Sequence, residues 1–302
     1  MIKILITGSN GFIGRHLYRN FQTNYELLGL DLKNDIVTNT KILDCSDLGL
    51  LTKELNNFKP DVIIHTAAIK QLELCEEHRA FSWKVNVNST ETIAKYSKES
   101  GAKVIYISSD VVFDGETGDY EENQPPSPIN WYGATKVASE NAVRLLPNSA
   151  ICRTALVIGN IDDDYSQILN NELKNDILQN QTLFVQYTAR RLKMGFPVYI
   201  SSAYMSNPTS VLLLTSMISK ITQNNLSGIF HTVGSTAISR LDFARLVARI
   251  YGLNSSLIIT DDSKISTIRP KDITLSFKST YDRLDLSEKD GSLELAVSKI
   301  LI

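Results

Sequence analysis

The chain has 302 residues, of which 43% are hydrophobic and 21% are charged, with a formal net charge of −2. This length suits one large domain or two fused ones with a buried core. The near-neutral charge provides no field to attract nucleic acid or an anionic membrane, so an anionic ligand must be bound by local features.

The first half of the chain alternates short β-rich runs with helical patterns. We expect strands at 2–7, 25–31, 62–68, 103–109 and 150–158, and helices at 12–22, 46–57, 79–99 and 133–146. The first, third and fourth strands are nearly continuous in apolar residues, which is typical of strands covered on both faces. The β-α-β-α order predicts an α/β fold of Rossmann type, a doubly wound parallel sheet with right-handed crossovers.

The pattern changes after about residue 159. Residues 161–181 are polar, acidic and rich in Asn and Gln, and both an exposed helix and a mobile insertion are compatible with them. Beyond them we expect helices at 182–194, 209–223 and 239–252 and strands at 197–200 and 228–234, with Ser239 as the N-cap of the last helix. The chain is thus predicted to form a Rossmann domain over 1–158 and a smaller α/β portion over 159–302, with the two interleaved.

Cysteine usage and the apolar stretches indicate the compartment. The three cysteines are far apart and form no C-x-x-C pair, which is typical of inert thiols in a reducing compartment. The first apolar run is too short for a signal peptide, and the longest later one, 211–218, is far shorter than the ~20 residues of a membrane span. We therefore expect a cytoplasmic protein. No metal site is expected, because no partner at metal-ligand spacing accompanies His16, His65, His78 or His231.

A glycine-rich loop follows the first expected strand. Gly8, Gly11 and Gly14 stand at intervals of three. The loop lies between strand 2–7 and helix 12–22, where backbone N–H groups at a helix start can bind a diphosphate. Glycines allow the tight turn and the close approach of backbone to phosphate. A purely structural turn is the alternative.

The end of the second strand supports the cofactor interpretation. Asp31 lies 17 residues beyond Gly14, and a carboxylate there can accept both hydroxyls of an adenosine ribose. It would also repel a 2′-phosphate, which favours NAD over NADP. Arg15 and Lys33 act in the opposite direction, since either could meet a 2′-phosphate.

A second group of residues carries acid–base chemistry. Tyr132 and Lys136 are four apart, so on a helix they project from one face. A nearby ammonium favours the phenolate and brings the tyrosine pKa towards neutrality. Ser109 ends the fourth strand, at the carboxyl edge where open parallel sheets bind ligands, and its hydroxyl can bond the reacting oxygen.

With these residues in this order, the sequence resembles the extended short-chain dehydrogenases/reductases. That family has the spacing G-x-x-G-x-x-G and an active site of Ser or Thr with Y-x-x-x-K. Within it, the chain is most similar to the dTDP-4-dehydrorhamnose reductase group, over almost its whole length. The segments that carry the resemblance are SSDVVFDG (108–115), PSPINWYGATKVASE (126–140), ICRTALVIG (151–159), GIFHTVG (228–234) and IRPKDITL (268–275).

The resemblance implies reduction of a nucleotide-activated 4-keto-6-deoxysugar, with NAD(H) preferred and NADP(H) possible. Tyr132 would donate the proton, Lys136 would hold the nicotinamide ribose and lower the tyrosine pKa, and Ser109 would polarise the keto group. The cofactor contacts expected on this basis are Gly8, Asn10, Gly11, Phe12, Ile13, Gly14, Asp31, Asp44, Ala67, Ala68, Tyr132 and Lys136.

Other residues have two interpretations each. Asp110, Trp131 and Arg153 are candidate substrate contacts; packing is the alternative for Trp131 and a structural ion pair for Arg153. Asn86 would lie beneath the active-site strands, where a structural role is equally compatible.

Two departures from the family pattern affect the expected substrate. Related sugar-nucleotide 4,6-dehydratases have Asp-Glu after the active-site Ser or Thr, whereas here Val111 follows Asp110. This favours a plain reductase. Loop 199–209 lacks the early acidic residue usual in rhamnose-type reductases, and 67–76 is similar to enzymes acting on UDP-N-acetyl sugars. The sugar is therefore left open.

Two other functions are compatible with the sequence. One is a nucleotide-sugar epimerase with tightly bound NAD. The other is a non-catalytic NADP-binding regulatory subunit, since a subunit of methionine adenosyltransferase has this fold; loss of the Tyr132–Lys136 pair would have suggested it. The partner we expect is a nucleotide sugar, with a homodimer as the candidate assembly and neither nucleic acid nor membrane as partner.

Overall fold

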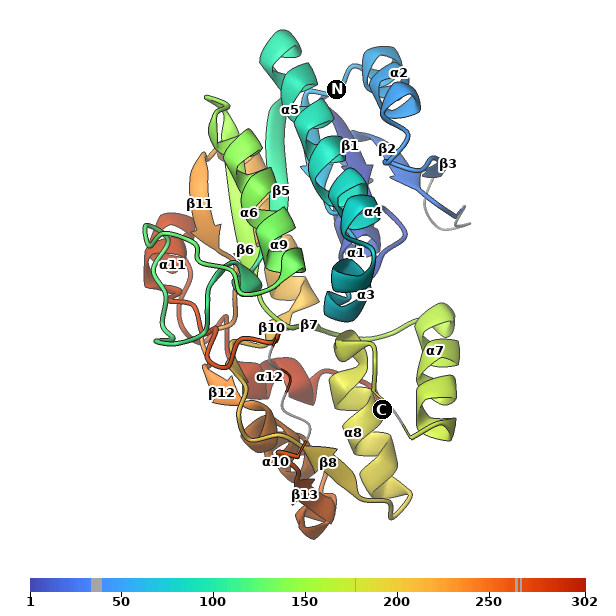
Figure 1. The fold of residues 1–302 in the computed structure, drawn as a ribbon, viewed down its shortest axis with the longest axis vertical. Coiled ribbons are helices and arrows are strands. Elements are labelled where there is room, and N and C mark those ends of the chain that lie inside the picture. The colour runs from blue at the N-terminus through green and yellow to red at the C-terminus, as the bar shows by residue number, and fades with distance from the viewer. Residues whose placement is uncertain (34–39, 177, 264–265, 267) are drawn as a thin grey trace. The chain divides into compact units, whose positions relative to one another are not determined.

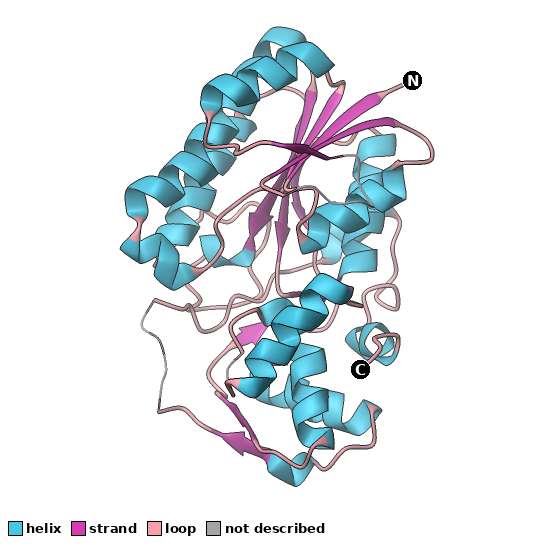
Figure 2. Cartoon of the chain, turned by 90° about the vertical axis from the view of Figure 1, so that its right-hand side faces the viewer, coloured by secondary structure: helices cyan, strands magenta, loops and turns pink. Residues whose placement is uncertain are grey.

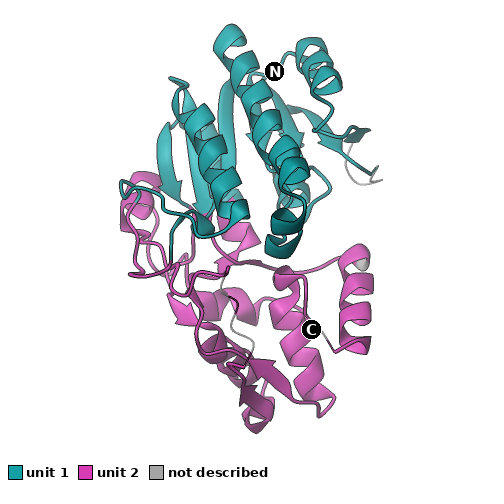
Figure 3. Cartoon of the chain, viewed as in Figure 1, with its two compact units in different colours: residues 1–114, 122–153, 215–231 teal, residues 115–121, 154–214, 232–302 magenta. Residues whose placement is uncertain are grey.

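The computed structural model describes residues 1–33, 40–176, 178–263, 266 and 268–302. The chain forms two compact units that alternate along the sequence (Figure 3). Unit 1 comprises Met1–Asp114, Glu122–Arg153 and Thr215–His231, and unit 2 comprises Gly115–Glu121, Thr154–Leu214 and Thr232–Ile302.

Unit 1 is built on a seven-stranded sheet with the order β11-β6-β5-β4-β1-β2-β3 (Figure 1). Its strands are β1 (Lys3–Thr7), β2 (Glu26–Asp31), β3 (Thr40–Ile42), β4 (Val62–His65), β5 (Lys103–Ser109), β6 (Ser149–Thr154) and β11 (Gly228–His231). The pairings of β1 with β2 and β4, of β4 with β5, of β2 with β3 and of β6 with β11 are all parallel. The predicted doubly wound α/β fold is confirmed, and Figure 2 shows helices on both faces of the sheet.

Both faces of the sheet are apolar because both are covered. Leu5, on β1, belongs to the core formed with helices α2 (Leu48–Phe58), α5 (Ser89–Ser100) and α6 (Trp131–Arg144). Its neighbours Ile4 and Ile6 point to the opposite face and are equally inaccessible. The other helices of this unit are α1 (Phe12–Phe21), α3 (Leu72–Glu77), α4 (Arg79–Trp83) and most of α9 (Val211–Gln223).

Three predicted elements differ from the observed ones by more than a shift at their ends. Strand 62–68 ends at His65, and the hydroxyl of the next residue, Thr66, donates to the Thr7 carbonyl at 2.7 Å. The expected helix 79–99 is interrupted by a π-helical turn at Lys84–Asn88. The expected strand 150–158 is two strands, β6 and β7 (Val157–Ile158).

Unit 2 combines short two-stranded pairings with helices. β7 pairs with β10 (Thr209–Ser210) and β8 (Val198–Ile200) with β13 (Ile258–Thr260), both parallel, while β9 (Met205–Ser206) and β12 (Ile238–Ser239) are antiparallel. Its helices are α7 (Asp163–Lys174), α8 (Phe184–Lys193), α10 (Arg240–Ile250), α11 (Lys278–Leu284) and α12 (Leu293–Ser298). Its core includes the stacked rings of Phe184 and Phe243, whose centroids are 4.7 Å apart.

Two expectations for the second half have clear outcomes. Ser239 is the N-cap of α10, where its Oγ accepts from the Asp242 amide at 3.0 Å, as predicted. Of the two alternatives for 161–181, an exposed helix and a mobile insertion, the structure has a helix over residues 163–174, α7. Among the described residues, none of the helices combines the length and the apolar character needed to cross a bilayer.

Candidate active site

The predicted site residues gather at the carboxyl edge of the sheet in unit 1. Gly8 directly follows β1, Asp31 is the last residue of β2, and Ser109 is the last residue of β5. Because these strands are parallel, their carboxyl ends lie along the same edge, where α/β sheets bind ligands.

The glycine loop has a conformation that larger residues would disturb. Gly8 has a φ of +67°, and a Cβ there would lie 2.7 Å from the Thr66 hydroxyl. A Cβ on Gly14 would lie 2.0 Å from the Gly8 carbonyl oxygen, so α1 packs directly on the loop. Gly11 is the N-cap of α1 and offers no side-chain cap, and first-turn amides of a helix lack intrahelical partners. A dinucleotide diphosphate fits this cradle.

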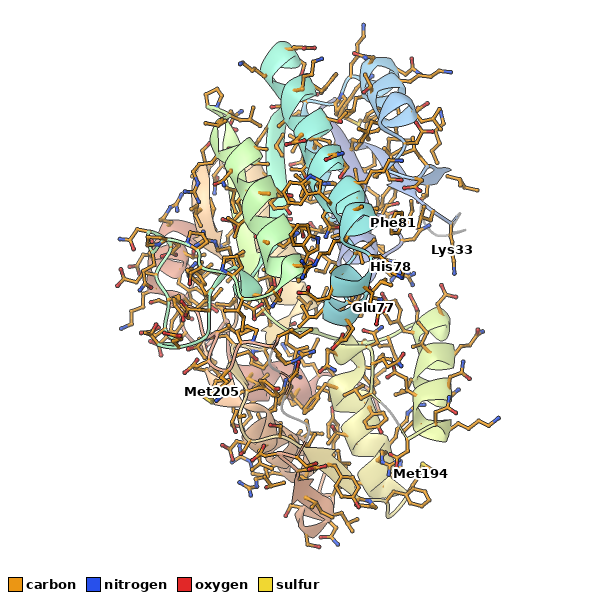
Figure 4. The ribbon with its side chains drawn as sticks, in the orientation of Figure 1. Lys33, Glu77, His78, Phe81, Met194 and Met205 are labelled. Atoms are coloured by element: carbon orange, nitrogen blue, oxygen red, sulfur yellow. The ribbon has the colours of Figure 1, made fainter. Side chains whose placement is uncertain are left out.

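Asp31 is oriented by the backbone of the same loop. Its two oxygens accept from the Asn10 amide at 2.9 Å and from the Leu32 amide at 2.7 Å. Each carboxylate oxygen has a second lone pair, so the group can also accept ribose hydroxyls. Arg15 differs from expectation: it is only 5% exposed and its Nε donates to the Asn10 carbonyl at 3.0 Å, which ties it to the loop rather than to a 2′-phosphate. Lys33 is exposed (Figure 4).

The remaining cofactor candidates line the same edge. Phe12 is buried, and its ring centroid lies 5.1 Å from that of His16. Ile13 and Ala68 are half-buried, and the Ala67 amide donates to the Thr7 hydroxyl at 3.3 Å. Asp44 is exposed and accepts from the Ser46 amide at 2.8 Å.

Helix α6 presents the acid–base pair. Asn130 caps its start by accepting from the Gly133 amide at 2.7 Å, and Tyr132 and Lys136 follow on one face. Lys136 is 3% exposed, donates to the Ile107 carbonyl at 2.6 Å, and its Nζ lies 6.0 Å from the Tyr132 ring centroid.

Ser109 links this pair to the end of β5. Its hydroxyl donates to Asp110 Oδ1 at 2.8 Å, and Asp110 is 5% exposed. The Ser109 hydroxyl also lies close enough to the Tyr132 phenol to act on the pKa of that tyrosine. The structure therefore brings together the three residues predicted to carry catalysis.

The electrostatics of the pair differ from the sequence expectation. Burial, followed by the Asp110 carboxylate, raises the pKa of Tyr132, while the nearby Ser109 hydroxyl acts against this shift. Burial lowers the pKa of Lys136 to about 7, and Glu140 opposes that shift. The direction of this shift in the Tyr132 pKa is opposite to the one expected from a neighbouring ammonium, because burial and the Asp110 charge dominate it. The Tyr132 phenol is protonated at neutral pH, which is the form that donates a proton.

Two of the substrate candidates have structural partners. The backbone amide of Trp131 donates to Glu76 at 2.7 Å, and the Arg79 guanidinium lies 5.1 Å from its ring centroid. Arg153 is completely buried and donates to both carboxylate oxygens of Glu140. For Arg153 the structure favours the alternative of a structural ion pair, because its guanidinium is directed at Glu140 rather than at the surface.

Asn86 has a structural role in the π-helical turn. Its Oδ1 accepts from the Ile69 amide at 2.8 Å, and its Nδ2 donates to the Ile69 carbonyl and to the Thr135 hydroxyl, both at 3.0 Å. It therefore ties the loop after β4 to α6 beneath Tyr132.

Sequence reasoning missed Glu140 and its bond from Ser108, whose hydroxyl donates to it at 2.6 Å. One signal was present: an arginine inside an apolar strand requires a buried acid, and Glu140 stands four residues after Lys136. Among the described residues, no three His, Cys, Asp or Glu side chains are grouped as metal ligands would be.

This fold is that of the extended short-chain dehydrogenases/reductases, a class of NAD(P)-dependent oxidoreductases. Within the class, the chain belongs to the RmlD substrate binding domain family, whose model matches residues 2–290. A hypothetical dTDP-4-dehydrorhamnose reductase from Sulfolobus tokodaii is 27% identical, with a TM-score of 0.84 and full coverage of both chains. The Bacillus anthracis dTDP-4-dehydrorhamnose reductase, in complex with NADP, is 24% identical, with a TM-score of 0.82 over 99% of this chain and 98% of that one.

Curated relatives include proteins of two kinds. Methionine adenosyltransferase 2 subunit beta of Xenopus laevis is 30% identical over 274 residues, covering 89% of this chain and 78% of that protein. The probable low-salt glycan biosynthesis reductase Agl14 of Haloferax volcanii is 25% identical, covering 96% and 95%.

Proposed function

We propose that the protein is an NAD(P)H-dependent reductase of a nucleotide-activated 4-keto-6-deoxysugar, with NAD(H) preferred and NADP(H) accepted. The observation that carries this proposal is the grouping of Ser109, Tyr132 and Lys136 at the carboxyl end of β5. The dTDP-4-dehydrorhamnose reductases of the same fold support the substrate class, and the NADP complex among them supports the cofactor class.

The residues of the site divide the work of the reaction. A reduced nicotinamide, when bound, supplies the hydride that reduces the keto carbon. The Ser109 hydroxyl can rotate about its Cβ–Oγ bond. It can therefore break its hydrogen bond to Asp110 and donate to the keto oxygen instead. Tyr132 donates its phenolic proton to that oxygen, and the Lys136 ammonium offsets the charge left on the phenolate. Val111 follows Asp110, so the second acid of a dehydratase is missing.

The test is turnover of a dTDP- or UDP-linked 4-keto-6-deoxysugar with NADH and NADPH. We expect one reduced nicotinamide to be consumed for each sugar reduced. Tyr132→Phe should lower kcat about 10²–10⁴-fold, because proton donation is lost, while its affinity for the cofactor stays within a few-fold. Turnover of the sugar without net oxidation of cofactor would instead support the epimerase.

A regulatory subunit is the second candidate, and the methionine adenosyltransferase beta subunits favour it. The retained Tyr132–Lys136 pair favours the enzyme. Three results together would support the regulatory subunit. The protein would bind NADP, it would reduce none of the 4-keto sugars, and it would change the activity of a methionine adenosyltransferase. The Tyr132→Phe variant would change that activity to the same extent as wild type. We also propose a homodimer, which sedimentation velocity measures directly.

A further inference from the structure

A buried ion pair lies behind the acid–base residues. Arg153 Nε and Nη2 donate to the two Glu140 oxygens at 3.0 and 2.8 Å, and both side chains are completely inaccessible. Burying such a pair is costly, and apolar replacements are often neutral or stabilising. Stability alone therefore does not explain why unit 1 contains it.

Glu140, the acidic member of the pair, lies on the same face of α6 as the lysine. Glu140 stands one turn after Lys136 on α6, so the two side chains point the same way. Lys136 donates to the Ile107 carbonyl at 2.6 Å, and the Ser108 hydroxyl donates to Glu140 at 2.6 Å. Together they attach α6 to two consecutive residues of β5, immediately before Ser109.

Titratable side chains from three elements act on or lie near the Lys136 ammonium. Tyr106 of β5 presents its ring 4.3 Å from Nζ, and Tyr132 lies on α6 itself. His65 of β4 is neutral, because burial and the Lys136 charge lower its pKa to about 3. Glu140 is thus the carboxylate whose charge acts on the ammonium.

We propose that Glu140 is a positioning residue: its carboxylate, held by Arg153 and Ser108 one helical turn from Lys136, stabilises the ammonium form of that lysine. Its consequence for the pH range of reduction rests on the proposed function. The two members of the pair must then act on Lys136 in opposite directions. Glu140→Gln removes the negative charge and leaves a cation, which disfavours the ammonium. Arg153→Met leaves an unpaired carboxylate, which favours it. If the pair did not act on the charge of Lys136, the two variants would leave its titration midpoint unchanged or shift it in one direction.

The experiment is an NMR titration of the cofactor-free protein labelled with [ε-¹³C]lysine, with Lys136→Arg to assign the resonance. We expect a wild-type midpoint near 7, since burial lowers the pKa of Lys136 to about 7. Glu140→Gln should lower the midpoint, and Arg153→Met should raise it, each by about one unit, as expected for one nearby charge. Arg144→Gln is the matched control: Arg144 lies 3.6 Å from the same carboxylate but is half exposed, so water screens its effect.

Opposite shifts support the proposal, and shifts of one sign or none overturn it. If Glu140→Gln does not fold, Arg153→Met decides alone: a raised midpoint supports the proposal, and an unchanged or lowered one overturns it. The basic limb of the kcat/KM profile for sugar reduction should move with the same sign as the midpoint. The two proposals can fail separately. If the two variants shift the Lys136 midpoint in opposite directions, as predicted, but the protein has no reductase activity, the proposed function is contradicted and this inference is not.

Discussion

A buried histidine, His65, lies among polar side chains at the active edge of unit 1. His65 is 1% exposed, and its two ring nitrogens lie 2.6 Å from the Thr7 hydroxyl and 3.1 Å from the Thr90 hydroxyl. Neutral imidazole satisfies these hydroxyls with one donor and one acceptor nitrogen. A proton added to this histidine would have to enter an interior that also contains the Lys136 ammonium.

We predict that His65 makes the protein less stable in acid. The folded state stays neutral down to about pH 3, whereas the unfolded chain takes up the proton as pH falls below about 6.5. The unfolded state thus binds more protons between these values, so the free energy of unfolding decreases as pH falls, by at most about 4–5 kcal/mol in total. Urea denaturation of wild type and His65→Gln at several pH values measures this loss of unfolding free energy.

The variant should show a shallower loss of stability between pH 6.5 and 4 than wild type. His78→Gln serves as control, because His78 is exposed on the surface of α3–α4 (Figure 4). Equal slopes for wild type and His65→Gln would reject the assignment.

At the scale of elements, the glycine loop and α1 form one packed turn. We predict that Gly14→Ala shifts the loop, because its Cβ would lie 2.0 Å from the Gly8 carbonyl oxygen. Overpacking of this kind costs about 1–3 kcal/mol, and we expect NADH affinity to fall at least about tenfold, or ~1.4 kcal/mol. Fluorescence titration with NADH and chemical denaturation measure the two effects.

Gly49→Ala is the matched control in α2. The nearest atom to its Cβ would be Asp47 Oδ1 at 3.5 Å, an ordinary contact. Alanine favours a helix over glycine by up to about 1 kcal/mol, so this variant should be as stable as wild type or more so. Unchanged NADH binding in Gly14→Ala would show that the loop does not hold the cofactor.

The π-helical turn joins three elements through one amide. In Asn86→Asp the shape is kept but the Nδ2 donor is lost, so a carboxylate oxygen faces the Ile69 carbonyl and the Thr135 hydroxyl. Leaving buried acceptors without a donor costs about 1–3 kcal/mol. We predict a loss of at least ~2 kcal/mol at pH 7, smaller at pH 4, where a protonated carboxyl can donate once. A loss independent of pH would contradict this account.

Elements were predictable where a local pattern determines them. The alternation of apolar runs and helical faces identified β1, β4, β5 and the layers around them, because both faces of each strand are buried. The interruption at Lys84–Asn88 was not predictable, since it coincides with tertiary bonds of Asn86 that no local pattern encodes. Strand β3 has three residues, too few for any periodicity to register.

The site shows the same division. Residue types at a strand end and on one helix face identified Ser109, Tyr132 and Lys136, because spacing alone places them. The partner of Arg153 depends on how α6 packs against β6, and the tyrosine pKa depends on burial and on Asp110. Both are properties of packing, which the order of residues does not reveal.

At the scale of the whole molecule, the residues proposed to bind the cofactor belong to unit 1, which has its own core. A ligand that binds only the folded state stabilises it by RT ln(1 + [L]/Kd), so the shift in Tm compares cofactors directly. Two backbone amides orient the Asp31 carboxylate, which still has lone pairs to accept hydrogen bonds from a ribose diol. The same negative charge repels a 2′-phosphate.

We therefore predict a larger Tm increase with NADH than with NADPH at equal concentration. Asp31→Asn should reverse or abolish this preference, with the ratio of the two affinities changing about tenfold, or ~1.4 kcal/mol, because the repulsion disappears. Lys33→Ala is the control for the exposed cation beside it and should weaken NADPH binding alone. The contrary result is a larger Tm increase with NADPH than with NADH in wild type. If Lys33→Ala abolishes that difference and Asp31→Asn leaves it unchanged, the lysine and not the carboxylate determines the choice of cofactor.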